Sequence, residues 1–217
     1  KTFYKLSDYG LKIFDKRYSY AGFKDYYKQS LKLIQGEIKL NSDKYCSSFS
    51  KVASIYEIIS KSNKDEMSIV SKHIEGAIIA PILVYFSYVK PNTSINVNEF
   101  KNEISEFLKS AGLINGKSLT DKGEYLLSKA YAYGVTESYM RTFLHIQDLA
   151  QNKIKGIANK MDTNNNEYHV NRALNVWGSG HSHTTYFKYI DNYVIDIFNQ
   201  PLEHQPIGVA DMGCGDG

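Results

Sequence analysis

The last nine residues, VADMGCGDG, combine an acid with three alternate glycines: Asp211, Gly213, Gly215 and Gly217. Glycines at alternate positions allow a sharp turn and let a ligand approach backbone N–H groups without a Cβ in the way. The apolar run before them, residues 207–210, is typical of a buried strand. The sequence therefore predicts a strand that ends in a nucleoside-binding loop. A plain strand-to-turn connection is the alternative reading.

A second group of reactive side chains precedes this loop. Residues 169–187 contain the only tryptophan, Trp177, and two histidines, His181 and His183, two positions apart. In a loop or a strand, imidazoles at this spacing can converge on a metal ion. The sequence shows no third ligand, which favours the alternative of a polar loop whose histidines bond neighbouring backbone.

The elements that position these residues are mostly helical. Apolar residues three and four positions apart mark one face of a helix. This spacing predicts helices over residues 23–40, 49–59, 66–88, 136–157 and 187–198. The third helix contains Pro81, which we expect to bend it or to separate two shorter helices. Its apolar part is shorter than the ~20 residues that a membrane span needs, so we interpret it as a buried core helix and expect no membrane association.

A compact pattern in the middle of the chain, FLKSAGLINGKSLTDKGEYLL, resembles the winged-helix fold over residues 98–133. We expect a helix over residues 98–110, a hairpin in which Leu113 pairs with Leu119, and a helix capped by Thr120. Winged helices bind DNA in some proteins and serve as dimerisation or lid domains in others.

Charge on the expected recognition helix disfavours DNA binding. A recognition helix presents several Arg or Lys side chains to base edges. Here Lys101 and Lys109 are balanced by three acidic residues, Glu99, Glu103 and Glu106. We therefore expect no nucleic-acid partner, and a winged-helix DNA-binding regulator is the least favoured reading.

Composition indicates a globular protein without a strong field of one sign. The 217 residues are 42% hydrophobic, and 26 basic and 23 acidic residues give a formal charge of +3. Two distant cysteines, Cys46 and Cys214, favour a reducing, cytoplasmic setting. The Asn- and Asp-rich stretch 162–166 is the clearest loop, and we interpret it as a boundary or hinge between domains at residues 1–161 and 167–217.

The D-x-G-x-G-x-G pattern resembles motif I of class I S-adenosylmethionine-dependent methyltransferases. Over residues 171–217 the chain is similar to the methyltransferases in the loading modules of some polyketide synthases, of the apratoxin and gephyronic acid type. The resemblance implies a mainly α fold, in which a helical lid with a winged-helix-like segment leads into the first strand and glycine loop of a Rossmann-like methyltransferase core.

The resemblance also implies a cofactor and its contacts. S-adenosylmethionine has an amino-acid moiety whose ammonium group favours a nearby acid, and the segment before motif I commonly packs over the cofactor. The cofactor-binding residues implied are Asp211, Gly213, Gly215, Gly217, Trp177, Gly178, Gly180 and Tyr186. Catalytic residues and metal ligands do not follow from it.

In the resembled family the methyl group goes to the carbon between the carbonyls of a malonyl unit on an acyl carrier protein. A divalent metal, iron or manganese, stabilises the enolate as a Lewis acid. A complete enzyme needs further strands and an acid for the ribose hydroxyls. We therefore expect the chain to be the N-terminal part of a longer methyltransferase working beside neighbouring synthase domains, or else a non-catalytic adaptor in a loading module.

Overall fold

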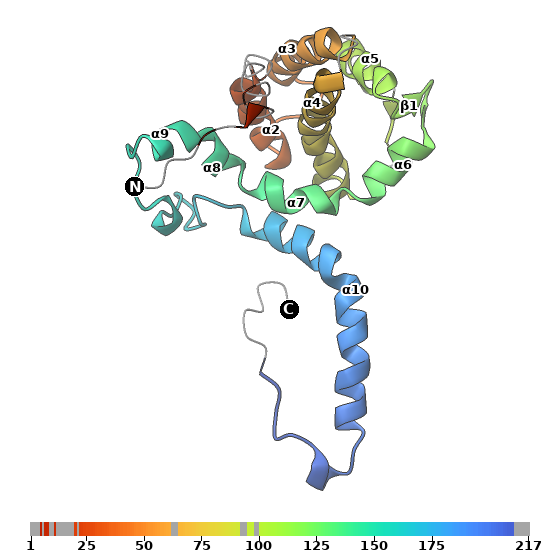
Figure 1. The fold of residues 1–217 in the computed structure, drawn as a ribbon, viewed down its shortest axis with the longest axis vertical. Helices are drawn as coiled ribbons and strands as arrows, with labels where there is room; N and C mark the ends of the chain where they lie inside the picture. Colours follow the sequence, from red (N-terminus) through yellow and green to blue (C-terminus); the bar gives the residue numbers. More distant parts are fainter. Residues whose placement is uncertain are drawn as a thin grey trace.

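The structure is a computed structural model of the chain, and helices dominate it (Figure 1). It describes residues 22–61, 65–91, 95–97 and 100–210, together with Lys5, Ser7, Asp8, Leu11 and Tyr20. Figure 1 shows two regions: a rounded body of packed helices, and a long last helix that leaves the body and projects away from it.

The elements follow in one order along the chain. They are α2 (Phe23–Ile34), α3 (Asp43–Ser60), α4 (Asp65–Val84), the π-helical turn η2 (Tyr85–Val89), α5 (Asn102–Ser110), β1 (Ile114–Asn115), β2 (Ser118–Leu119), α6 (Asp121–Ser128), α7 (Tyr131–Ser138), α8 (Met140–Leu144), α9 (Ile146–Ala150), the 3-10 turn η4 (Ile157–Asn159), α10 (Arg172–Phe198) and the 3-10 turn η5 (Leu202–His204). The mainly α class expected from the sequence is confirmed.

Helix α4 lies at the centre of the body, where Ile74 and Ile78 are fully buried. Among the described helices, the stretch Ile69–Val89 is long and apolar enough to cross a membrane, but more than half of it is buried inside the protein. It is therefore accounted for as a core helix. One of the two sequence expectations was that Pro81 separates two shorter helices. This is wrong, because the α-helix continues through Pro81 to Val84 before the π-helical turn begins.

Helix α2 ends six residues earlier than its apolar pattern predicts. Gly36 adopts φ +74°, a left-handed conformation that favours glycine. Its N–H donates to the Leu33 carbonyl at 3.0 Å, and the Glu37 N–H donates to the Lys32 carbonyl at 2.9 Å. These two bonds form the Schellman motif that terminates helices. The apolar residues that follow belong to a turn that packs on the core.

The helix expected over residues 136–157 is wrong, because the structure divides this stretch into the short helices α7, α8 and α9. At the end of α7, the Ser138 carbonyl accepts a hydrogen bond from the Asn171 N–H at 2.8 Å. Tyr139 then leaves the helical conformation, with φ −95° and ψ 11°. One turn later the Thr142 hydroxyl donates to the His169 carbonyl at 2.8 Å. The break thus lies where a distant segment docks.

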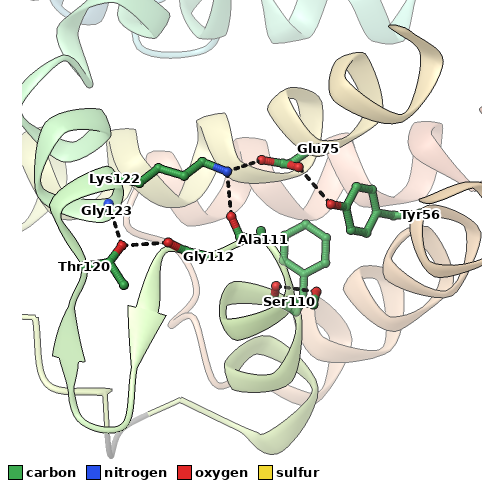
Figure 2. Close-up of polar contacts among 9 residues, drawn as sticks. Tyr56, Glu75, Ser110, Ala111, Gly112, Thr120, Lys122 and Gly123 are labelled. Atoms are coloured by element: carbon green, nitrogen blue, oxygen red, sulfur yellow. Dashed lines mark hydrogen bonds and ion pairs between the residues drawn. The ribbon is translucent and has the colours of Figure 1, made fainter. Parts of the chain in front are cut away.

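The winged-helix pattern is confirmed, with one change of register. Ile114, not Leu113, pairs with Leu119 across the hairpin, while the Leu113 carbonyl accepts from the Thr120 N–H. Thr120 caps α6 as expected, since its Oγ1 accepts from the Gly123 N–H at 3.1 Å (Figure 2). A Cβ at Gly123 would lie 2.2 Å from the Leu113 carbonyl oxygen, so only glycine fits there.

A polar network holds this hairpin region on α4 and α3 (Figure 2). The Lys122 ammonium donates to Glu75 at 2.8 Å and to the Ala111 carbonyl at 2.6 Å. The Tyr56 hydroxyl donates to the other Glu75 oxygen at 2.8 Å. Burial, together with the Glu75 carboxylate, raises the pKa of Tyr56 to about 12. The network fixes the wing as part of the body.

Candidate functional site

The glycine loop predicted to bind a nucleoside cofactor begins at the edge of the described chain. Asp211, Gly213, Gly215 and Gly217 lie outside the described residues. The run 207–210 before them is not the buried strand that the sequence suggests. Ile207 and Val209 are exposed, and no strand among the described residues lies beside them to complete a hydrogen-bonded ladder.

The segment predicted as a polar loop around Trp177 is helical. Residues 172–198 form the continuous helix α10, and the Asn171 side chain caps it by accepting from the Leu174 N–H at 3.1 Å. Gly178 and Gly180 lie inside this helix, although glycine has a poor helix propensity. Tertiary packing overrides the propensity, as the contact with α7 explains.

Two glycines allow α7 and α10 to touch. A Cβ at Gly178 would lie 2.7 Å from the Val135 backbone nitrogen, and one at Gly134 would lie 2.8 Å from the Trp177 ring. The Trp177 ring also lies 5.3 Å from the Tyr88 ring, measured between centroids. Trp177 and Gly178 therefore lock α10 onto the body.

The structure thus separates the cofactor-lining residues predicted on α10. Trp177 and Gly178 lie at the contact with α7, whereas Tyr186 lies two turns further along and 66% of it is exposed. Gly180 lies between them on the same helix, and its carbonyl accepts from the Thr184 hydroxyl at 3.1 Å. Whether these four residues line a cofactor pocket stays a prediction.

The two histidines do not converge on a metal ion. On a helix, residues two apart point about 200° away from each other, so His181 and His183 do not form the shared site that was the less favoured interpretation of the sequence. His181 Nδ1 lies 2.8 Å from the Trp177 carbonyl oxygen, and its ring stacks on Tyr131. The His183 ring instead lies against Phe187. In the part of the chain that the structure describes, no cluster of three His, Cys, Asp or Glu side chains could hold a metal.

A polar cleft of 390 Å³ lies where α2, α8 and the start of α10 meet, and it contains two of the chain's three arginines. Arg141 pairs with Asp162 at 3.3 Å, and its guanidinium lies over the Tyr168 ring. Arg172 forms two 2.7 Å hydrogen bonds with Glu167. The four ionic side chains therefore carry no net charge as a set. The pair of Arg141 with Asp162 holds the segment before α10 on α8.

The predicted hinge, residues 162–166, lines this cleft. The Asp162 carboxylate accepts from the N–H groups of Asn166 and Asn164, which together with Arg141 lower the pKa of Asp162. Met161 pairs with Glu167 in an isolated antiparallel bridge that closes the turn. The loop is therefore an ordered, hydrogen-bonded turn, while the domain boundary placed there stays a prediction.

A buried carboxyl in α7 is the most unusual group in the body. Burial raises the pKa of Glu137 to about 8, and its Oε2 has no hydrogen-bond partner among the described residues. Glu137, Gly134 and Arg141 were not predicted as site residues from the sequence. Two signals were available: a glycine within a helical pattern at Gly134, and the scarcity of arginine in a chain rich in lysine, which makes Arg141 stand out.

Comparisons with known proteins agree with this arrangement. The AprA winged helix domain matches residues 75–153, a wider region than the sequence pattern alone indicates. The AprA MT2-like domain matches residues 167–217, which include α10 and the glycine loop. No curated protein matches the chain. The chain is therefore similar, in this order, to an AprA winged helix domain and to an AprA MT2-like methyltransferase domain.

Proposed function

We propose that the chain is the N-terminal part of an S-adenosylmethionine-dependent methyltransferase that methylates the α carbon of a malonyl-type unit on an acyl carrier protein. The observation that carries this proposal is the match of residues 167–217 to a methyltransferase domain directly after a winged helix of the same origin. The D-x-G-x-G-x-G pattern at the end of that match supports the choice of cofactor.

In this proposal, Asp211 and the alternate glycines Gly213, Gly215 and Gly217 hold the amino-acid end of the cofactor. The cofactor supplies the electrophilic methyl group. The described residues have a positioning role, because the contact at Gly178 fixes the direction of the helix that leads to the loop. Such fixed orientation is one source of rate enhancement, since reacting groups must meet in a narrow range of geometries.

A divalent metal, implied by the family resemblance, has no matching ligand set among the described residues. His181 and His183 point apart, and no third ligand lies near them in that part of the chain. No step of the proposed reaction is therefore assigned to these histidines.

The winged helix fits an architectural role better than DNA binding. Lys101, directly before α5, pairs with Asp43, and Lys109 near the end of α5 pairs with Glu106. Glu103 is exposed beside them. A surface on which the lysines are already paired with carboxylates offers few free cations to phosphates, which dominate the affinity of DNA-binding proteins.

The decisive experiment uses the chain together with the methyltransferase sequence that completes it. Calorimetry should detect S-adenosylmethionine binding, and Asp211→Ala should weaken it at least tenfold, whereas the control Asp196→Ala on exposed α10 should not. Incubation with labelled cofactor and a malonyl-loaded carrier protein should transfer the label to the carrier. Absence of binding would contradict the proposal. Binding without transfer to the malonyl carrier would refute the proposed acceptor and favour the adaptor.

A further inference from the structure

Helix α10 has two halves in different surroundings. Its first half, up to about Ser182, packs on α7 and carries the buried Leu174 and Gly178. Its second half leaves the body, as Figure 1 shows, and every residue from 183 to 197 is exposed. One continuous helix therefore serves two environments.

The exposed half is nevertheless apolar on one side. Seven large apolar or aromatic side chains follow one another at intervals of one, two or three residues: Tyr186, Phe187, Tyr189, Ile190, Tyr193, Val194 and Ile197. At about 100° per residue they cover an arc of about 160°. Lys188 and Asn192 lie on the opposite side, where Ile195 is the only large apolar residue. We call the seven residues the α10 apolar face.

This face is too large to be ordinary surface. A helix with a wide apolar stripe buries that stripe against another element, and burying each large apolar side chain contributes to stability. Tyr193 is 71% exposed and Tyr186 66%, so most of that contribution is still to be gained. Contiguous exposed apolar surface of this kind marks an interaction site.

We propose that the α10 apolar face is the docking surface for the β-sheet of a methyltransferase core. The occupant follows from two observations. The face lies within residues 167–217, which match a methyltransferase domain. The chain then turns at η5 and presents a second apolar segment, in which Ile207 and Val209 are exposed. The helix and the apolar strand-like run have no covering element in the part of the chain that the structure describes. Together they form one side of an α/β layer, and a sheet is what completes such a layer.

The inference deepens the proposed function and rests on it, since it names the partner that the methyltransferase match requires. It gives α10 a double role: the Gly178 end belongs to the helical body, and the Tyr193 end belongs to the core. It also offers Tyr186 a different role from the predicted one, as a packing residue between helix and sheet instead of a cofactor contact.

Cysteine labelling tests the face against its own opposite side. In a Cys214→Ser background, in which the remaining Cys46 is buried, single variants carry Ile190→Cys or Val194→Cys on the apolar face. The matched controls Lys188→Cys and Asn192→Cys lie on the other side. In the chain of 217 residues, all four should react with a maleimide at similar rates.

In the protein extended by the methyltransferase core, the two apolar-face cysteines should react at least tenfold more slowly, while the controls keep their rate. Equal rates at all four positions would overturn the inference. So would protection in the chain of 217 residues accompanied by a doubled mass, because the occupant would then be a second copy. Protection of these two cysteines, together with a failure of the extended protein that retains Cys214 to bind S-adenosylmethionine, would support the docking surface while contradicting the proposed function.

Discussion

The helical body and the far half of α10 have the same apolar periodicity in sequence, but only the body buries its apolar side chains. Apolar residues recur three and four positions apart in both, in α4 as in residues 186–197. In the body that face is closed by neighbouring helices, so Ile78 is fully buried. In α10 it is open, and Ile190 is 52% exposed. The periodicity therefore predicts a helix and a buried face, but it does not say whether the covering element belongs to the same stretch of chain.

The largest effect on stability is expected for the helical body, where the apolar face of α4 is buried. Ile78→Ala removes a fully buried side chain from the central helix, and the transfer loss plus the cavity should lower the free energy of unfolding by about 2–5 kcal/mol. Urea denaturation followed by circular dichroism measures the change. A loss below about 1 kcal/mol would mean that the body is packed much more loosely than the structure shows.

The next effect is a pH dependence that arises from Glu137. Burial raises its pKa from 4.5 to about 8 in the folded chain, so folding favours the protonated form. Its stabilising contribution is complete below pH 4.5 and is lost as the pH rises through 8, a decrease on the order of a few kcal/mol.

The measurement compares the unfolding free energy at pH 5 and pH 9 for the wild type and for Glu137→Gln. The variant keeps a neutral, similar side chain and should lose most of the slope between these two values. The exposed Glu106→Gln should retain it. Identical slopes for the wild type and Glu137→Gln would show that Glu137 is not the titrating group.

A smaller change in stability, whose sign is informative, is expected for substitutions at the contact between α7 and α10. Gly178→Ala should destabilise the chain by about 2 kcal/mol, because its Cβ would overlap the Val135 nitrogen. Gly76→Ala is the matched control within α4, where nothing lies within 4 Å of a new Cβ, and it should stabilise by about 0.5–1 kcal/mol. Thermal unfolding gives both signs. Stabilisation by both substitutions would contradict the close contact of α7 and α10.

The smallest effect on stability is expected for the exposed half of α10. Ile190→Ala in the chain of 217 residues should change the unfolding free energy by less than about 0.5 kcal/mol, because the side chain makes few contacts to lose. The same substitution in the protein that includes the methyltransferase core should cost about 2 kcal/mol or more. Equal small effects in both would remove the distinction drawn between the two halves of α10.

Much of the body was predictable because local signals and tertiary packing agree there. Thr120 caps α6 where the sequence indicated, and the winged-helix hairpin forms one residue away from the expected pairing. The stretch 136–157 was not predictable as three helices, because its break depends on a hydrogen bond from Asn171, more than thirty residues away in sequence. Local periodicity carries no information on such a contact.

The local structure around Trp177 was not predictable from its residue types. Two glycines and two histidines between Trp177 and Phe187 suggested a loop, since each of these residue types is a modest or poor helix former. The structure places them in a helix whose Gly178 packs directly against α7, where a side chain would not fit. The glycine loop that follows stays a prediction from its own pattern of acid and alternate glycines.

The contact at Gly134 and Gly178 has a consequence for the predicted glycine loop that follows α10 in sequence. From Gly178 to the end of α10 at Phe198 a helix of this length extends about 30 Å, so a tilt of about 4° at the crossing moves the far end by about 2 Å. The absence of a side chain at Gly134 and Gly178 therefore determines the angle at which α10 leaves the body. Substitutions at this crossing would aim the loop that follows α10 without touching any residue of the loop itself.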